Sequence, residues 1–552
     1  MQNSEVINTN DIKEIYLIPV DFFNPKNFIE RYKKELAIFR RRIREEDKEK
    51  VKGALNTFYI ACINSQLDEK IKLEIHLGFF DTLNFYAQQY SSKQTYQNII
   101  SAFEKPELKS KLFSKHTAKS SIIYAETLLM YHNLLKSEEP FFSFDKTELL
   151  IKAKSYLWKV YIQYLENKNP LNQADLSHCL TLLSLGLTEL SRWFEPLYYL
   201  NVAKENLQHN PNIEYTRALL LEAVKEKTCL SFNGLLLLKI IDSCMEAKKL
   251  PQILTEQKKQ LIKTESECRK NIKDYNLDIK NLRKHKAKVS KSIIRYNAYK
   301  KFCVDSQLFI NEHSFYCKCN KATSDDLQIE TNHEHTKIDW VKQFHTILDV
   351  SIYDFIVARH NYYYSLAETK ISTFQINGVK RINSNDGIKN ALLKNSFKTL
   401  YSILDQIAHG IFQVLNIDYQ SKLKIKFPDE KERPKIYFLN MWDKELALFD
   451  KKHFEDNFYL ISLYSISRDL SKSDYAALSN FRKLRNAMEH NVLHIVKSDK
   501  EVSHYKSLGE EVCTKEELIE KTKILMLLTK SAIFSFTYLI RRQSKVISIN
   551  KQ

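Results

Sequence analysis

Glycine and proline are so scarce in this chain that long helices are the main way to account for its length. There are 8 Gly and 10 Pro among 552 residues. Tight turns and β-bulges depend on Gly, whereas helix interiors exclude both residues. Hydrophobic residues make up 43% of the chain, enough for a sizeable buried core. The sequence therefore predicts an all-α protein with short connections, divided into roughly three domains at this length.

The net charge of +18 indicates a polyanionic partner, and RNA or DNA is the first expectation. The alternative is that an AT-rich genome inflates the use of Lys. Nucleotide-binding loops are excluded, because the closest glycines, Gly378 and Gly387, allow neither GxGxxG nor a Walker A loop. The zinc-protease pattern HExxH is absent as well, so several common enzyme classes are ruled out.

Three features of the sequence favour a cytoplasmic protein with no membrane association. The nine cysteines are scattered without a paired framework, as is typical of reduced thiols. The first ten residues, MQNSEVINTN, lack the apolar stretch of a secretory signal. The most apolar stretch, Ile524 to Ile540, contains Lys530 and is too short to cross a bilayer comfortably.

The first 250 residues show the spacing of consecutive amphipathic helices. A charged helix is expected from Phe28 to Lys52, and its run Arg40 to Arg42 favours a solvated face over a binding site. Tetratricopeptide-like pairing is the best description of the segment from Leu176 to Leu207. It has helices on either side of a turn at Ser191–Arg192. The first helix would span Leu176–Leu190 and the second Glu195–Leu207, with Pro211 ending the repeat and a third helix starting near Tyr215.

A helix pair of this kind cannot bury its own apolar face, so neighbours must stack on it. Residues 117–165 could supply them. An irregular helical bundle is the alternative, because the usual Gly and Ala positions of the repeat are mostly lost.

Residues 257–301 carry over half of the excess charge, with 15 Lys or Arg against 4 Asp or Glu, a net of +11. The segment is compatible with one basic helix lying along a nucleic-acid backbone. A solvated face and a dock for an acidic partner are the alternatives. The predicted RNA-binding cluster consists of Arg283, Lys284, Lys286 and Lys288.

Cys317, Cys319, His333 and His335 form a CxC…HxH pattern, which raises the question of a zinc site. CxC is tighter than the common CxxC turn, and no finger-like core separates the pairs. Ordinary loop residues are the favoured interpretation, and we expect neither a metal nor a cofactor.

The segment from Phe481 to His490, FRKLRNAMEH, is the most informative for chemistry and closes a predicted helix that begins near Tyr475. At 100° per residue, Asn486 and His490 share a face, as do Arg485 and Glu489. The amide of Asn486 could orient the imidazole, while the guanidinium reaches the same cleft from its flank.

These groups suit RNA cleavage by the 2′-hydroxyl route without a metal. An imidazole can act as base or acid near neutral pH, and a guanidinium stabilises the developing oxyanion charge. One motif offers one suitable His, so a twofold dimer would supply both proton transfers. His494, four residues beyond His490 on the same face, is an alternative second group. On spacing alone, however, Arg-x4-His is common, and a surface helix with an Arg485–Glu489 salt bridge is the structural alternative.

The surroundings of the motif resemble the HEPN superfamily, and in particular a prokaryotic family with tetratricopeptide-like repeats upstream. The motif of the superfamily is Arg, a polar residue, a few spacers and His, which here is Arg485, Asn486 and, after three spacers, His490. Further blocks resemble that family in order: 182–218 in the repeats, 302–311 and 324–327 between domains, 354–364 and 400–408 in the first two HEPN helices, 436–442 in an insertion, and 523–539 in the last helix.

The resemblance covers about residues 180–540 and implies a four-helix HEPN core, dimerisation, and metal-independent endoribonuclease activity. It also implies a role in phage defence or toxin-like growth arrest. The expected layout is a helical N-terminal region (1–165), tetratricopeptide-like repeats (166–256), a basic helix and connector (257–340), and a HEPN domain (341–545). A regulatory protein could bind the repeats. One alternative is a non-catalytic HEPN and repeat scaffold that binds protein or RNA. A second is a sequence-nonspecific nucleic-acid binder in which residues 257–301 dominate and the HEPN part merely dimerises.

Overall fold

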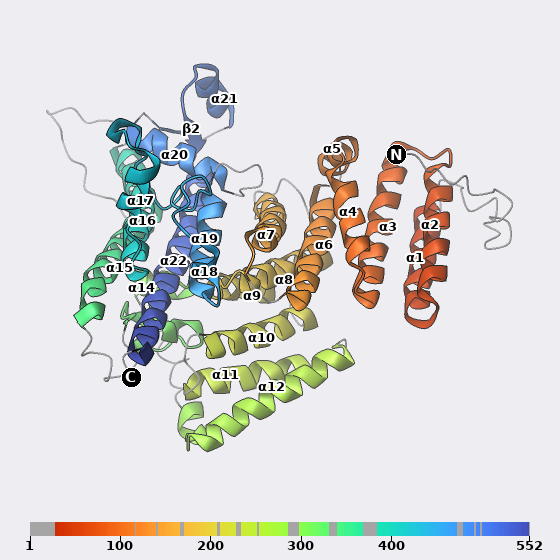
Figure 1. Ribbon diagram of the computed structural model, residues 1–552, viewed down its shortest axis with the longest axis horizontal. Coiled ribbons are helices and arrows are strands. Elements are labelled where there is room, and N and C mark those ends of the chain that lie inside the picture. The colour runs from red at the N-terminus through yellow and green to blue at the C-terminus, as the bar shows by residue number, and fades with distance from the viewer. Residues whose placement is uncertain are drawn as a thin grey trace. The chain divides into compact units, whose positions relative to one another are not determined.

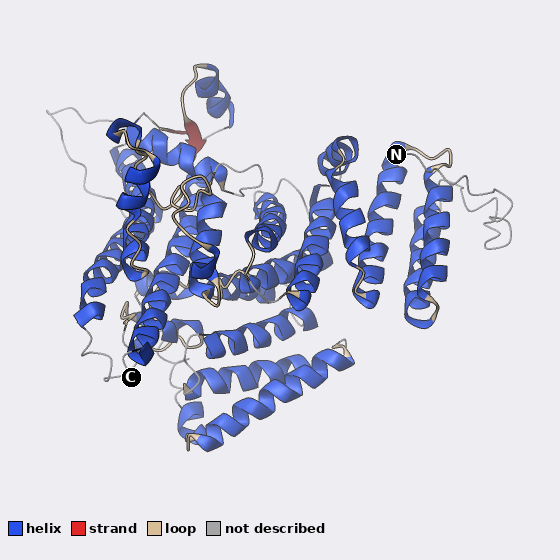
Figure 2. Cartoon of the chain, viewed as in Figure 1, coloured by secondary structure: helices blue, strands red, loops and turns tan. Residues whose placement is uncertain are grey.

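The computed structural model describes residues 28–115, 117–139, 142–165, 171–206, 210–227, 233–250, 253–284, 297–329, 339–367, 384–471, 478–490, 493–496 and 499–550. Within these ranges the chain is almost entirely helical, which confirms the all-α prediction (Figure 2). The described strands are β1 (His494–Val496) and β2 (Val512–Thr514), which pair in parallel.

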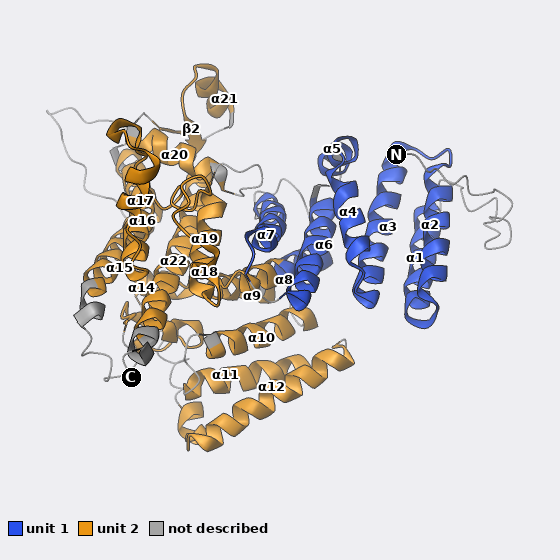
Figure 3. Cartoon of the chain, viewed as in Figure 1, with its two compact units in different colours: residues 1–182 blue, residues 183–552 orange. Residues whose placement is uncertain are grey.

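The chain forms two compact units, residues 1–182 and 183–552, and the division falls inside helix α8 (Gln173–Glu189) (Figure 3). The helices of the first unit are α1 (Phe28–Glu45), α2 (Lys48–Ile63), α3 (Glu69–Tyr90), α4 (Lys93–Glu104), α5 (Pro106–Lys115), α6 (Thr117–Glu138) and α7 (Phe144–Leu165). Two of them, α6 and α7, pack along each other.

The single charged helix predicted from Phe28 to Lys52 is wrong, because the chain breaks between α1 and α2. The carboxylate of Asp47 accepts the backbone amides of Glu49 and Lys50, both at 3.1 Å. An acidic side chain in this position satisfies amides that a new helix leaves unpaired, so it starts α2 instead of continuing α1.

The second unit opens with helices that pack on one another in sequence: α9 (Phe194–Asn206), α10 (Pro211–Lys227), α11 (Gly234–Lys248) and α12 (Thr255–Asp274) (Figure 1). The turn between α8 and α9 falls at the expected place, with Ser191 at a φ of 60°. Helix α10 begins at Pro211, four residues before the start expected near Tyr215, since a proline at the first helical position lacks only an amide that would be unpaired anyway. The tetratricopeptide-like character of these helices stays a prediction.

The basic segment is not one helix, contrary to the prediction. After α12 ends, Asn276 adopts a φ of 50°. The carboxylate of Asp278 then accepts the amides of Lys280 and Asn281 at 2.8 and 3.1 Å, and a new helical stretch runs over residues 279–284. Short polar side chains near a left-handed residue favour such a restart.

The connector between helices α9–α12 and the C-terminal bundle spans residues 297–329. It contains α14 (Ala298–Asp305) and the short 3-10 helices η2 (Glu312–Phe315) and η3 (Asn320–Thr323). Arg359 holds it to the bundle: the guanidinium donates to both carboxylate oxygens of Asp325, at 2.8 and 2.6 Å, and to the carbonyl of Leu308 at 2.8 Å. The blocks at 302–311 and 324–327 are therefore structural parts of this connector.

The C-terminal bundle is built from α15 (Asp339–Leu366), α16 (Ser384–Val414), α19 (Phe458–Leu470) and α22 (Lys515–Asn550). Helix α15 packs on α16, both pack on α22, and α22 also packs on α19. Gly410 allows the close approach of α16 and α22, because a Cβ there would collide with the ring of Phe536. The remaining elements are α17 (Tyr419–Lys426), η5 (Glu430–Glu432), α18 (Lys451–Phe454), α20 (Ser479–His490) and α21 (Asp499–Ser507).

Among the described helices, α22 has a stretch, Lys515–Ser544, that is long and apolar enough to cross a membrane. The expectation of a stretch too short to cross a bilayer, based on residues 524–540, is therefore wrong in length. In the fold, 89% of its most apolar window is buried, as expected of the central helix of a packed bundle.

Candidate active site on helix α20

Helix α20 packs against α16 through a narrow apolar face. Phe481, Leu484 and Ala487, three residues apart along the helix, are buried. The ring of Phe481 lies 5.7 Å from that of Phe397 on α16. Most of the other described side chains of the helix are exposed, so α20 is an amphipathic helix at the edge of the bundle.

Arg485 lies at the border of this packed face, and its guanidinium turns toward α16. Its Nη2 donates to Asp405 Oδ2 at 3.0 Å, and its Nε donates to Glu489 Oε1 at 3.2 Å. The guanidinium carbon also lies 5.2 Å from the ring centre of Tyr401. Burial alone would lower the pKa of Arg485, but the carboxylates of Asp405 and Glu489 outweigh it and raise the pKa above its ordinary value. The guanidinium is therefore a permanent, oriented positive charge.

Asp405 is the site residue that the sequence analysis missed. Its Oδ1 accepts the backbone amide of Phe438 at 3.1 Å, while its Oδ2 receives Arg485. It thus ties the inserted segment around Phe438 to the motif helix. Tyr401 and Asp405 are four apart on α16 and share a face. An available signal was that Asp405 is the one charged residue in the stretch 400–408.

The ring of Tyr401 packs against the guanidinium of Arg485. Its side chain is buried, and its hydroxyl has no hydrogen-bond partner among the described residues. Burial raises the pKa of this phenol, with Arg485 opposing the shift. The phenol therefore stays neutral and offers the guanidinium its ring face.

Lys394, near the beginning of α16, holds the chain just beyond the end of α20. Its Nζ donates to the carbonyl of Leu493 at 2.6 Å. Burial lowers the pKa of Lys394 below its ordinary value. Lys394, Phe397, Tyr401 and Asp405 are spaced three or four residues apart, so one face of α16 supports the whole motif helix.

The predicted catalytic residues fall on α20 as follows. Asn486 is exposed on the outer side of the helix. His490 is the last residue of α20, and its side chain lies outside the described residues, as does Tyr475, where the helix was expected to begin. Arg485 and Glu489 form the salt bridge that the structural alternative expected. Arg485 turns toward Asp405, whereas Asn486 faces solvent.

The expectation that His494 continues the same helical face is wrong, because α20 ends at His490 and His494 lies in strand β1. Its Nε2 is 2.7 Å from Glu510 Oε2, and its ring stacks on Tyr505 with centroids 4.4 Å apart.

Of the predicted RNA-binding cluster, Arg283 and Lys284 are exposed within the helical stretch 279–284. Lys286 and Lys288 lie outside the described residues. Two further exposed basic residues, Arg482 and Lys483, lie on the motif helix itself and were not singled out by the sequence analysis.

Of the four residues in the CxC…HxH pattern, Cys317 and Cys319 are described, whereas His333 and His335 are not. The structure instead places His313, which the pattern did not include, beside the two cysteines.

Residues 335–543 match a family model described as LA2681-like HEPN. No curated protein and no solved structure gives a significant match to the chain. The matched range begins just before α15 and ends within α22, so it contains α15, α16, α19 and α20 and most of α22. The C-terminal bundle of this all-α protein is therefore a HEPN domain of the LA2681-like type.

Proposed function

We propose that this protein is an endoribonuclease that cleaves RNA by 2′-hydroxyl attack, with Arg485, Asn486 and His490 as its active centre and no metal in the reaction. The proposal rests above all on one observation. The motif helix of a HEPN domain carries Arg485 with its guanidinium fixed by Asp405 at 3.0 Å.

A fixed guanidinium suits the electrostatic part of the reaction. Arginine has five N–H donors, and the two ion pairs formed by Arg485 involve its Nε and one Nη2 donor. Its side chain remains 18% exposed, so the other N–H groups can donate hydrogen bonds to the non-bridging oxygens of a scissile phosphate. Donors that are already oriented need no reorganisation when the charge develops.

In this proposal the imidazole of His490 performs the proton transfers, and Asn486, four residues earlier, orients it. A general base removes the proton of the 2′-hydroxyl, and a general acid protonates the leaving 5′-oxygen. One chain supplies one His in the motif, so we propose a homodimer with two motifs across a shared cleft.

Helix α15 offers a surface for such a dimer. Val350, Tyr353, Val357 and Tyr364 are 41%, 65%, 51% and 45% exposed and recur at intervals of three, four and seven residues. This is the spacing of a seam between two helices, and large apolar side chains are rarely left in solvent along one stripe. A second copy of the HEPN domain would cover it.

Basic residues would guide the RNA toward the centre. Arg482 and Lys483 are positioned on α20 itself, and the cluster of Arg283, Lys284, Lys286 and Lys288 would contact the backbone farther along. Replacing that cluster with Gln should weaken RNA binding and flatten its salt dependence, with little change in cleavage at saturating RNA. Unchanged affinity and salt slope would favour a solvated segment or an acidic protein partner.

The repeat helices have a physical route to the motif, which supports regulation by a protein bound to them. Arg192, in the turn after α8, forms a fully buried ion pair with Asp469 near the end of α19. The carbonyl of Asp469 accepts the amide of Leu478 at 3.2 Å, directly before α20 begins. A movement of the α8–α9 turn would therefore reach the start of the motif helix. Such an effector would suit phage defence or toxin-like growth arrest in the cytoplasm.

The alternative function is a non-catalytic scaffold, and one observation favours it. The Arg485–Glu489 pair at 3.2 Å is what a merely structural surface helix would form. The scaffold predicts RNA or protein binding without cleavage, and with no requirement for His490.

The test is an RNA cleavage assay with analysis of the product ends. Full-length protein with EDTA present should release 2′,3′-cyclic phosphate ends or their hydrolysis products. Strict Mg²⁺ dependence with 5′-phosphate ends would point to another mechanism. Intact RNA under every condition, with RNA binding retained, would support the scaffold.

A further inference from the structure

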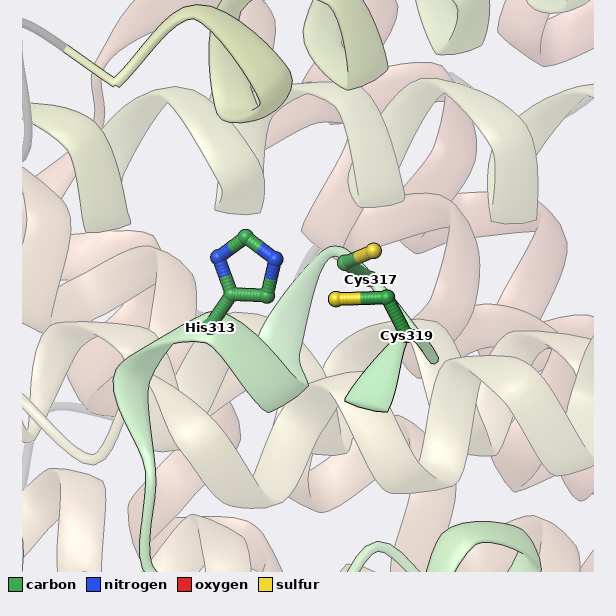
Figure 4. A group of neighbouring side chains, drawn as sticks. All are labelled: His313, Cys317 and Cys319. Atoms are coloured by element: carbon green, nitrogen blue, oxygen red, sulfur yellow. The ribbon is translucent and has the colours of Figure 1, made fainter. Parts of the chain in front are cut away.

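Within the connector, His313, Cys317 and Cys319 come together in a cluster outside the HEPN motif (Figure 4). One ligand atom of each, a ring nitrogen and two sulfurs, lies within 4.8 Å of the other two. We propose that these three residues bind a structural zinc ion. This proposal does not depend on the cleavage chemistry.

The local fold delivers the three side chains from only seven residues. His313 lies in η2, and its carbonyl accepts the amide of Cys317 at 3.0 Å, closing a turn. Cys319 precedes η3, and its carbonyl accepts the amide of Ala322 at 2.9 Å. The two short helices therefore bring the three side chains of the H-x3-C-x-C pattern close together.

The donor set and the distances suit zinc. Thiolates and imidazole favour zinc, whereas magnesium and calcium take oxygen ligands. In a tetrahedral site with Zn–S bonds of about 2.3 Å, neighbouring ligand atoms are about 3.8 Å apart. On binding zinc, the distances between the ligand atoms would shorten by about 1 Å from the present upper limit of 4.8 Å. Two thiolates would neutralise the charge of the ion, which suits a site where Cys319 is only 6% exposed.

A neighbouring hydroxyl supports the required tautomer of His313. Its Nδ1 lies 3.1 Å from the hydroxyl of Tyr316, which also receives a hydrogen bond from Asn233, the N-cap of α11. If Nδ1–H donates to this oxygen, Nε2 carries the lone pair for the metal. Metal-binding histidines usually have such a second partner. These residues supply three of the four ligands of a tetrahedral site, and a further side chain or a water molecule would supply the fourth.

The position of the cluster indicates what the ion would do. Phe315, between the ligands, stacks on Phe194 of α9 with centroids 4.1 Å apart, and lies 4.9 Å from Phe534 of α22. Glu312, next to His313, accepts from Tyr538 and Arg541 of α22, both at 2.6 Å. Zinc would therefore rigidify the turn that joins the repeat helices to the last helix of the HEPN domain.

The experiment measures zinc by elemental analysis in untagged full-length protein from zinc-supplemented cells. About one zinc ion per chain is expected, with less than about a tenth remaining in Cys317→Ser, Cys319→Ser and His313→Asn. The matched control is Cys303→Ser, a buried cysteine of the same connector outside the cluster, which should keep its zinc.

A second readout guards against variants that simply misfold. A chelator should lower the melting temperature of wild type and of Cys303→Ser by several degrees and leave that of Cys317→Ser unchanged. Folded wild type with zinc far below one per chain, or with another metal in its place, would overturn the proposal. Retention of zinc by the three cluster variants would do the same, as would its loss only from His333→Ala and His335→Ala.

Discussion

The carboxylate of Asp405 on α16 accepts a hydrogen bond from the guanidinium of Arg485 on α20, across 3.0 Å and 80 residues of sequence. The same carboxylate binds the amide of Phe438 with its other oxygen. Asp405 thus fixes the direction of the one permanent positive charge in the motif.

Asp405→Asn should therefore lower the cleavage rate at saturating RNA by about tenfold, which corresponds to roughly 1.4 kcal/mol of transition-state stabilisation. RNA affinity should stay close to wild type, because Asp405 positions Arg485 without touching the substrate. The unfolding free energy should fall by about 1 kcal/mol or less, since the pair is partly solvated.

The matched control for Asp405 is Glu489→Gln, which removes the other carboxylate bound to Arg485. Its effect on cleavage should be less than about twofold. Equal losses from both variants would show that Asp405 has no special positioning role.

The buried pair of Arg192 and Asp469 should couple the turn between α8 and α9 to the motif helix. Asp469→Asn removes one of the two carboxylates that pair with the buried Arg192, and because Glu195 keeps the other ion pair, the loss of stability should be about 3 kcal/mol or less. Cleavage per folded molecule should fall as well, because loss of this ion pair loosens the end of α19, where the backbone carbonyl of Asp469 accepts the amide of Leu478 directly before α20.

The control is the largely buried pair of Arg359 and Asp325, which joins the connector to α15. Asp325→Asn should destabilise the fold to a similar degree but leave cleavage per folded molecule unchanged. If the two variants lose cleavage in proportion to stability alone, the proposed route from the repeats to the motif is wrong.

The apolar stripe on α15 should hold the dimer together. Tyr353→Glu combined with Val357→Glu places two charges in it and should give a monomer by light scattering, with cleavage lost. Ile425→Glu, at an 82% exposed apolar position on α17, is the control and should remain dimeric and active. A monomeric wild type that cleaves RNA at full rate would contradict the dimer.

Lys530 should make stability depend on pH. Burial lowers its pKa to about 7, partly opposed by Asp325, whereas an unfolded lysine has a pKa of about 10.4. Between these values the unfolded chain holds a proton that the folded chain has released, so stability rises with pH.

Lys530→Met should therefore be more stable than wild type at pH 6, by at most a few kcal/mol, and the advantage should shrink toward pH 9. Urea unfolding of both proteins across this range measures it. A difference that does not change with pH would mean that Lys530 stays charged in the fold.

The sequence predicted what depends on composition and local spacing. The scarcity of Gly and Pro led to the all-α class, and the blocks around Asp354 and Leu400 identified helices that the structure contains. Breaks set by single polar side chains were missed, because Asp47 and Asp278 act through capping bonds that a helical pattern does not reveal. The start of α10 was expected near Tyr215 and not at Pro211, because a proline suits both the first turn of a helix and the chain beyond the end of the preceding helix.

The sequence also identified the motif around Arg485 but not its partner. Asp405 is 80 residues away, and only the packing of α16 on α20 brings the two together. His313 was missed because the CxC…HxH pattern pairs the two cysteines with His333 and His335, which follow them in the sequence. The turn between η2 and η3, which places His313 beside Cys317, has no repeating pattern to indicate it.

The most direct test of the central claim compares RNA cleavage by wild type and by His490→Ala, with folding checked by circular dichroism and melting temperature. The account predicts an unchanged fold and a loss of about 10² to 10⁴-fold in cleavage, the usual cost of removing a general acid–base. Near wild-type cleavage by the folded variant would remove His490 from the mechanism and contradict the account.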